Sequence, residues 1–185
     1  MKIQKQLVKY GKKLHEDKFV IGAGGNISAK EKELIFIKKK YANMSKGRKK
    51  DYLPLERTRQ EMPDEELFSS ETPMHLACYE AREDIGAVIH VHSPLMTATA
   101  FKTDVIKDIS YEADCVIASD VPIIEYIQPG SKALAAEVSD KIKKGANAVL
   151  MKRHGALTVG KDLEEAYMRI LALERACISY LMGKG

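Results

Sequence analysis

The sequence predicts a mixed α/β protein in which helices pack around a largely antiparallel sheet. Segments with apolar residues three and four positions apart, typical of amphipathic helices, are interspersed with short apolar runs typical of strands. No internal repeat and no low-complexity tract interrupts this order. The 185 residues, 45% of them hydrophobic, fit one compact domain over 1–185 with a core of ordinary size.

The first half begins with a helix over residues 2–17, whose apolar stripe is Ile3, Leu7, Tyr10 and Leu14. The segment "KFVIGAGGNISAK" that follows predicts a short strand, a glycine-rich turn and a second strand. "ELIFIKK" predicts a third strand, which forms a hairpin with the second. Lysine and arginine dominate residues 38–50, and "DYLPLERTRQEMPDEELF" is irregular with two prolines. We expect disorder or a functional loop over this long connection.

The second half is more regular. Thr72 and Pro73 are a good N-cap and first-turn pair for a helix that runs to about Arg82. The elements expected after it are a strand at "AVIHVH", a helix opened by Ser93-Pro94, a helix from Pro129-Gly130-Ser131 to Lys144, a strand at "NAVLMKRHG" stopped by Gly155, and a long helix over 162–182 ended by Gly183.

Composition narrows the class of protein. The charged N-terminus "MKIQKQLVKYGKK" is no export signal, and no apolar run approaches the ~18 residues of a membrane span. We therefore expect a cytoplasmic protein with no membrane partner. Three distant cysteines argue against a disulfide framework or a thiolate zinc site. A net charge of +4 suits an anionic small substrate and is too weak by itself to imply nucleic acid.

Three histidines are candidate metal ligands. His90 and His92 occupy alternate positions of a strand, so their imidazoles project from the same face. Such a pair also occurs as ordinary satisfied polar residues. His154 follows another strand directly before Gly155, where a side chain can point into a cleft. Three imidazoles with one open coordination position are typical of catalytic zinc.

Two further groups offer polar chemistry. Glu71 stands at the predicted helix start, where a carboxylate is commonly explained by helix-end electrostatics alone. The adjacent hydroxyls of Ser69 and Ser70, with the free N–H groups of the helix start, also form a natural anion cradle. In "GAGGNIS", Gly25 and Asn26 permit close backbone approach to a ligand, although a bare glycine turn explains them equally well.

In this order, the motifs "GGNIS", "SSETPMHLACYEAREDIGAVIHVHSP" and "LMKRHGALTVGKDLEEAY" closely resemble the class II aldolase and adducin head-domain family over nearly the whole chain. The resemblance implies a three-layer α/β/α fold with a central, mainly antiparallel sheet. It also implies a homotetramer with active sites between subunits.

By the same resemblance, His90, His92 and His154 match the zinc ligands, and Glu71 matches the catalytic acidic residue. Tyr111 falls where aldolases carry a tyrosine that acts from a neighbouring subunit. The positions that hold the substrate phosphate are matched by Gly25, Asn26, Ser69 and Ser70.

The implied function is that of a zinc-dependent aldolase. It would cleave a ketose 1-phosphate similar to L-fuculose 1-phosphate into dihydroxyacetone phosphate and an aldehyde, by way of a metal-stabilised enediolate. Glutamate at position 71 and the tyrosine favour aldolase over the family's epimerases. The alternatives are a ketose-phosphate epimerase, a methylthioribulose-1-phosphate type dehydratase, and a non-catalytic adducin-like binding domain.

One segment departs from the family pattern. Family aldolases grip the phosphate with a turn that contains Thr or Ser and Gly, whereas this chain reads "IFIKKKYANMSKGRKK". Lys38, Lys39 and Lys40 can supply charge for a phosphate or another anion, and Lys40 is our candidate for phosphate binding. Seven basic residues between 38 and 50 are also typical of a solvated loop. A nucleic-acid contact ranks last, because the run lacks interleaved aromatic residues beyond Tyr41 and Tyr52.

Overall fold

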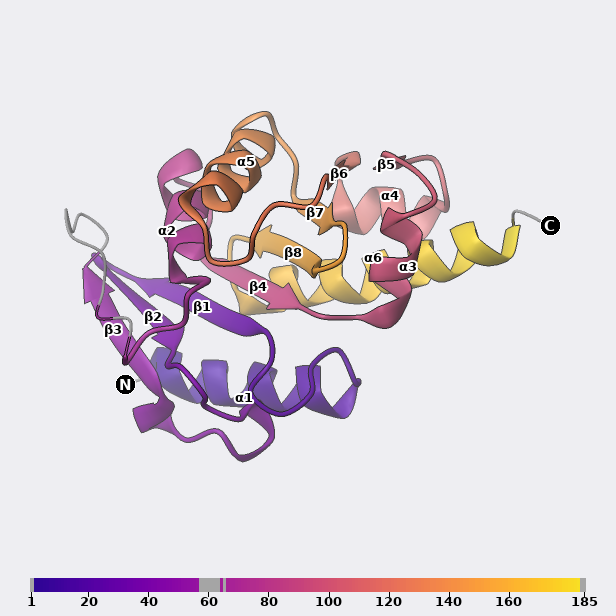
Figure 1. The fold of residues 1–185 in the computed structure, drawn as a ribbon. Helices are drawn as coiled ribbons and strands as arrows, with labels where there is room; N and C mark the ends of the chain where they lie inside the picture. Colours follow the sequence, from indigo (N-terminus) through magenta and orange to yellow (C-terminus); the bar gives the residue numbers. More distant parts are fainter. Residues whose placement is uncertain (1, 57–63, 65, 184–185) are drawn as a thin grey trace.

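The computed structural model describes residues 2–56, 64 and 66–183 (Figure 1). The helices are α1 (Lys2–Glu16), α2 (Thr72–Ala81), α3 (Pro94–Ala100), α4 (Tyr111–Ile117), α5 (Lys132–Lys143) and α6 (Leu163–Gly183). The strands are β1 (Asn26–Glu31), β2 (Leu34–Lys38), β3 (Tyr52–Glu56), β4 (Ala87–Val91), β5 (Val105–Ile106), β6 (Val121–Ile124), β7 (Ala148–Met151) and β8 (Gly155–Gly160). Two short 3-10 turns, η1 (Met44–Lys46) and η2 (Lys49–Asp51), lie between β2 and β3.

The strands of the described residues form one sheet in the order β3-β2-β1-β4-β8-β7-β6-β5. Every neighbouring pair is antiparallel except β6 and β7, which run parallel. The predicted hairpin joins β1 to β2, with Ser28 opposite Ile37. The expected central, mainly antiparallel sheet is therefore confirmed.

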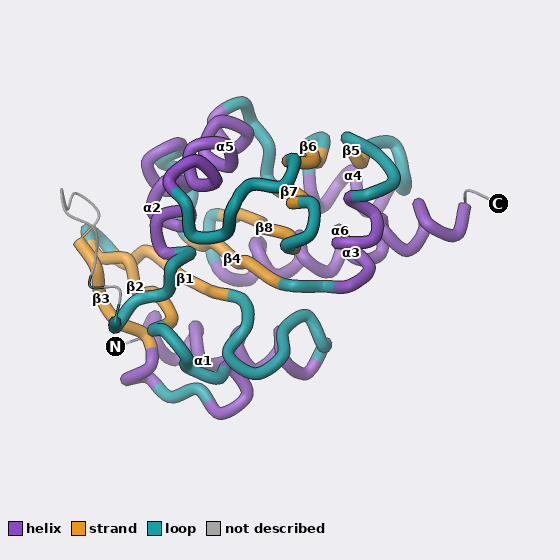
Figure 2. The backbone as a smooth tube through the Cα atoms, in the orientation of Figure 1, coloured by secondary structure: helices purple, strands orange, loops and turns teal. Residues whose placement is uncertain are grey.

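Helices cover both faces of the sheet (Figures 1 and 2). On one face, Met74 of α2 and Leu134 of α5 pack with Val88 and Val149 of the sheet. On the other face, helices α1, α3, α4 and α6 bury their apolar sides in a second cluster. Two cores separated by a sheet make the three-layer α/β/α arrangement that was expected. Among the described helices, none has both the length and the apolarity needed to cross a membrane.

The prediction of a strand at the start of "KFVIGAGG" was wrong, because the structure has no strand between α1 and β1. Lys18 has a φ of 64°, so the chain turns sharply where α1 ends. The amide of Phe19 donates to Leu14 and that of Lys18 to His15, the paired bonds of a Schellman helix ending. Phe19 and Val20 are buried against the core from this turn, which explains the apolar pair without a strand.

The irregular stretch expected over residues 51–68 was also wrong in part. Tyr52–Glu56 forms β3, which pairs with β2 at the end of the sheet. An edge strand tolerates Pro54, because one side of its backbone needs no partner. Residues 57–63 and 65 of the same expectation lie outside the described part of the chain. Before β3, the basic segment is held by the buried side chains of Ala42 and Met44.

Several other expectations need correction. The strand in "NAVLMKRHG" ends at Met151, and Gly155 begins a further strand, β8, instead of ending β7. Three short elements were not predicted from the sequence: β5 with two residues, β6 with four and α4 with seven. Elements this short carry too few positions for a period to stand out, and they form because the neighbouring sheet and helices pack on them.

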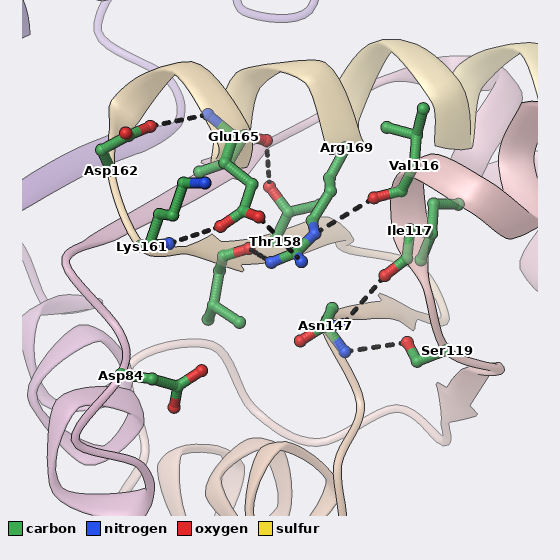
Figure 3. A network of polar contacts seen from close by, with 12 residues as sticks. Asp84, Val116, Ile117, Ser119, Asn147, Thr158, Lys161, Asp162, Glu165 and Arg169 are labelled. Carbon is green, nitrogen blue, oxygen red and sulfur yellow. Dashed lines mark hydrogen bonds and ion pairs between the residues drawn. The ribbon is translucent and has the colours of Figure 1, made fainter.

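A buried arginine joins α6 to the sheet and to α4 (Figure 3). The guanidinium of Arg169 donates to the carbonyl oxygens of Val159 at 2.7 Å and Val116 at 3.3 Å, and it lies 3.4 Å from Glu165. Nearby, the hydroxyl of Thr158 donates to the carbonyl of Ala166 at 2.8 Å. These bonds join α6 to β8 and to α4 through main-chain carbonyl oxygens of all three elements.

We expect Arg169→Met to lower the free energy of unfolding by about 2 kcal/mol, since two carbonyls inside the protein lose their donors. Urea denaturation measures this loss. The matched control is Arg175→Met, on the same helix but with a side chain 71% exposed, which should cost less than about 0.5 kcal/mol. Equal losses in the two variants would contradict a clamping role for Arg169.

Candidate metal centre and active site

The three candidate histidines meet at one end of the central strands. His90 belongs to β4, His92 follows its last residue, and His154 lies in the turn between β7 and β8. Their ligand atoms all lie within 4.8 Å of one another. The ring centroids are 4.7 Å apart for His90 and His92, 4.7 Å for His90 and His154, and 5.4 Å for His92 and His154. The structure thus brings together the residues that the sequence singled out.

Strand pairing creates this meeting. Strands β4 and β8 are antiparallel neighbours with Val91 opposite Ala156, so the turn before β8 reaches the end of β4. Gly155 permits the approach, because a Cβ there would overlap the carbonyl oxygen of Val91 and lie 3.2 Å from the ring of His92. Arg153, with a φ of 60°, turns the chain so that His154 faces the pair.

The hydrogen bond of His90 and the lowered pKa values of the cluster suit it to a cation. Nδ1 of His90 donates to the carbonyl of Ala156 at 3.0 Å, which leaves Nε2 as an acceptor 2.9 Å from Nε2 of His92. Burial, followed by the neighbouring histidines, lowers the pKa of His90, and burial lowers that of His154 to about 4. Neutral imidazoles with converging lone pairs are what a divalent metal requires. The triad therefore fits a metal ion.

The glycine-rich segment lies directly against the histidines. Gly25 has a φ of 65°, and a Cβ there would come within 2.7 Å of the carbonyl oxygen of His90. A Cβ on Gly24 would lie 3.4 Å from Nδ1 of His92. Asn26 then enters β1 opposite His90. At Gly25, only a residue without a side chain allows the loop this close approach.

Ser69 connects this loop to the start of α2. The side-chain amide of Asn26 donates to Oγ of Ser69 at 3.1 Å, and the backbone N–H of Glu71 donates to the same oxygen at 3.2 Å. Ser70 lies against Gly130, where a Cβ would come 2.8 Å from that of Ser70. Four residues expected to hold phosphate, Gly25, Asn26, Ser69 and Ser70, thus lie in two segments that touch the histidine cluster or one another.

Glu71 occupies the N-cap position of α2, a correction to the expectation that Thr72 would do so. Its side chain makes no capping bond, and only 7% of the residue is exposed. Burial raises the pKa of Glu71 to about 7, although the backbone N–H of Gly130 donates to the carboxylate. Oε2 has no partner among the described residues. A buried carboxyl that titrates near neutral pH can give or accept a proton, which a plain helix cap has no need to do.

The structure gives two further candidates, Tyr111 and Lys40, other surroundings. Tyr111 begins α4 and is 86% exposed, so its expected action from a neighbouring subunit stays a prediction. The ammonium of Lys40 lies 5.5 Å from the ring centroid of Tyr41, and the backbone N–H of Lys40 donates to Leu67 at 2.8 Å. The lysine that points inward is Lys38, which is 2% exposed. The three residues before it, Ile35, Phe36 and Ile37, are all buried, so the alternation of side chains along the strand does not single it out.

The whole chain can be compared with known proteins. Residues 5–181 match the family model described as Class II Aldolase and Adducin N-terminal domain. The chain belongs to this family. As the resemblance implied, it is an enzyme of the class II aldolase type, a class that depends on a metal.

The similarity to class II aldolases covers most of the length of the relatives as well as of this chain. An L-fuculose phosphate aldolase of Methanococcus maripaludis is 31% identical over 179 residues, 96% of each chain. A 5-deoxy-D-ribulose 1-phosphate aldolase of Bacillus thuringiensis is 30% identical over 169 residues, which cover 90% of this chain and 78% of the relative. The structure of L-fuculose-1-phosphate aldolase from Thermus thermophilus superimposes with a TM-score of 0.88, covering 99% and 97% of the chains at 22% identity.

The raised pKa of Glu71 predicts a pH-dependent stability difference in metal-free protein. The folded pKa of about 7 exceeds the ordinary glutamate pKa of 4.5, so between these pH values the folded state binds more protons than the unfolded state. The free energy of unfolding therefore falls as pH rises through this window. Glu71→Gln should lack this fall and gain on the order of 2 kcal/mol relative to wild type from pH 4.5 to 7.5, measured by urea denaturation.

The control for this prediction is Glu112→Gln, at a residue whose side chain is 62% exposed. Its stability should follow that of the wild type at each pH. A difference between wild type and Glu71→Gln that stays constant with pH would contradict the burial argument.

Proposed function

We propose that this protein is a zinc-dependent aldolase that cleaves a ketose 1-phosphate, similar to L-fuculose 1-phosphate, into dihydroxyacetone phosphate and an aldehyde. The observation that carries the proposal is the convergence of His90, His92 and His154 next to the segments that hold Asn26 and Glu71. The relatives' names support the reaction, because both the archaeal and the Bacillus protein are called sugar-phosphate aldolases.

Zinc is the metal we favour, since three imidazoles with an open position are typical of its catalytic sites. A cation held there would act as a Lewis acid and stabilise negative charge on the oxygens of the substrate during cleavage. The protein's part is to hold the three rings in place. The carbonyl of Ala156 orients His90, and the close approach at Gly155 brings His154 to the other two rings.

Glu71 is our candidate for the proton donor. In the cleavage direction, a base accepts the proton of the substrate hydroxyl that becomes the aldehyde, and the neighbouring carbon–carbon bond breaks as the aldehyde forms. The remaining carbon then takes a proton, which Glu71 gives. Its pKa of about 7 allows both protonation states near neutral pH, as this role requires. We propose that Tyr111 of a neighbouring subunit, in a homotetramer, is the group that interacts with the aldehyde oxygen.

The phosphate of the substrate would lie between the glycine-rich loop and the start of α2. Gly25, Asn26, Ser69 and Ser70 line these two segments, with Lys40 as a further candidate. Ser69 already joins the segments through Asn26 and the N–H of Glu71. A small anionic sugar, and neither a membrane nor a nucleic acid, is therefore the proposed partner of a single-domain, cytoplasmic enzyme.

Other activities of the family use the same parts. The Bacillus relative's name favours a 5-deoxypentulose phosphate as a second substrate of the same bond cleavage. An epimerase or a dehydratase would also need the metal site but would release no triose phosphate. A binding domain of the adducin type has no need of three converging imidazoles and a buried carboxyl, so these four groups argue against it.

We expect His92→Ala to lose bound metal and to lose at least about a thousand-fold in turnover, because two imidazoles hold a cation much less tightly than three. Elemental analysis measures the metal, and a coupled assay for dihydroxyacetone phosphate measures turnover on a panel of ketose 1-phosphates. His15→Ala, in α1 and outside the cluster, should retain both. A His92→Ala enzyme with full metal content would contradict the assigned ligand set.

Glu71→Gln should keep the metal and lower kcat by about a thousand-fold, since the amide cannot give a proton. The same coupled assay reports this loss, and Glu112→Gln serves again as the control with unchanged kcat. Product analysis by NMR separates the reactions. Epimerised or dehydrated sugar phosphate without any triose phosphate would overturn the aldolase proposal.

A further inference from the structure

His154 is held less directly than His90. Nδ1 of His90 donates to the carbonyl of Ala156 at 3.0 Å, so a hydrogen bond fixes the orientation of that ring. Nδ1 of His154 is buried and has no partner among the described residues. The backbone N–H of His154 donates to the carbonyl of Met151 at 3.1 Å. The place of the His154 ring therefore depends on the conformation of the turn over residues 152–154, between β7 and β8.

The backbone of this turn has a conformation that its sequence does not favour. Arg153 has a φ of 60°, in the left-handed region where glycine and asparagine are the common residues. A residue with a long side chain stays in this region where its surroundings stabilise it. A contact from outside the turn can supply that stabilisation.

An aromatic ring makes such a contact. The guanidinium carbon of Arg153 lies 4.2 Å from the ring centroid of Tyr126, within the ~6 Å of a cation–π interaction. Tyr126 is 42% exposed, and its hydroxyl donates to the side-chain oxygen of Gln128 at 3.2 Å. The ring is thus fixed at its hydroxyl end while its face contacts the guanidinium.

Tyr126 belongs to the β6–α5 connection, which comprises residues 125–131. At the start of this connection, the backbone N–H of Lys152 donates to the carbonyl of Ile124 at 3.0 Å, and the side chain of Lys152 forms an ion pair with Glu125. The first two residues of the turn therefore both contact the connection, Lys152 through these bonds and Arg153 through the ring of Tyr126.

The other end of the β6–α5 connection reaches the start of α2. The backbone N–H of Gly130 donates to the carboxylate of Glu71. Gly130 has a φ of 77°, and a Cβ there would lie 2.8 Å from that of Ser70. One short connection thus contacts both the turn that carries His154 and the segment that carries Glu71.

We propose that the stack of Arg153 on Tyr126 is a positioning device for the metal centre, which holds the turn in the conformation that brings His154 to His90 and His92. This inference deepens the proposed function and rests on it for the presence of a metal. The two stacked side chains are positioning residues, because they act through His154. Their loss should weaken metal binding by misplacing the third ring.

The test compares the metal affinities of Tyr126→Leu, Tyr126→Phe and Arg153→Asn. Leucine has no π face, whereas phenylalanine keeps the face and loses only the hydroxyl. Asparagine suits a φ of 60° and removes the guanidinium, so backbone strain cannot explain a loss in this variant. The matched control is Lys32→Asn, which makes the same kind of change at a φ of 59° in the exposed turn between β1 and β2.

Metal affinity is measured by titrating chelator-treated protein with Zn²⁺ in competition with a chromophoric chelator. We expect Tyr126→Leu and Arg153→Asn to bind Zn²⁺ roughly ten-fold more weakly than wild type, and Tyr126→Phe and Lys32→Asn to stay within about two-fold. The double variant should bind within about two-fold of either single variant, because both remove the same contact. Wild-type affinity in Arg153→Asn, or equal losses in Tyr126→Phe and Tyr126→Leu, would overturn the proposal.

A spectrum and a melting curve separate positioning from a general loss of structure. Co²⁺ bound in place of zinc reports the coordination geometry through its visible absorption, which should change in Tyr126→Leu and Arg153→Asn. Without metal, both variants should melt within about 3 °C of wild type. A lower melting temperature with an unchanged Co²⁺ spectrum would show a contact that only stabilises the fold. If Tyr126→Leu does not fold, Arg153→Asn, at an exposed residue, decides the question.

Kinetics excludes a direct contact with the substrate. For a ketose 1-phosphate that the enzyme cleaves, Tyr126→Leu and Arg153→Asn should recover kcat and KM within about three-fold of wild type once the metal is in excess. A raised KM with unchanged Zn²⁺ affinity would make Arg153 a substrate contact and overturn the positioning role.

The two proposals fail in different ways. Zn²⁺ affinity that depends on the stack, with no triose phosphate from any ketose phosphate, would overturn the aldolase function and leave the positioning role. Triose phosphate released by an enzyme whose Tyr126→Leu variant binds Zn²⁺ as tightly as wild type would do the reverse. Absence of Zn²⁺ uptake by the wild type would overturn the positioning role whatever the reaction.

Discussion

The antiparallel pairing of β4 with β8 is the interaction on which the site depends. It joins residues 66 positions apart, and the bond from His90 to the carbonyl of Ala156 is part of the same contact. The register of this pairing places His154 at the end of β4, beside His90 and His92. The hydrogen bond to Ala156 selects the tautomer of His90. A shift of one residue in this register would turn His90 to the opposite face of the sheet. The convergence of the three histidines is thus a consequence of sheet register, and the helices on both faces stabilise that register.

Polar groups near this register are buried at a cost that packing alone does not explain. Oε2 of Glu71, Oδ1 of Asn26 and Nδ1 of His154 have no hydrogen-bond partner among the described residues. Elsewhere, as at Arg169, the fold supplies donors to main-chain carbonyls that would otherwise lack them. The contrast separates the two regions physically. One network is closed and stabilises the fold, and the other is left open beside the histidines, as sites that bind ligands commonly are.

The family relationship and the local chemistry inform different levels of the function. Similarity over nearly the whole chain assigns the class of enzyme. We expect substrate preference to depend on a few side chains around the loop at Gly24 and the end of β2, where the chain departs from the pattern of the family. One fold can accommodate related substrates through changes in a few side chains around a site, with little effect on the backbone.

The sequence by itself determined the α/β class, the principal helices, the β1–β2 hairpin and the three histidines. These follow from local periodicity, from glycine and proline at boundaries, and from the alternation of side chains along a strand. Only the tertiary structure decided what depends on distant partners. The strands β3, β5 and β6 come from segments too short or too irregular to show a strand pattern in the sequence. At Lys18, where a strand was expected, the structure has the end of a helix. The structure also turns Lys38 inward while Lys39 forms an ion pair with Asp51, because burial depends on which segment covers a residue, and no local pattern contains that information.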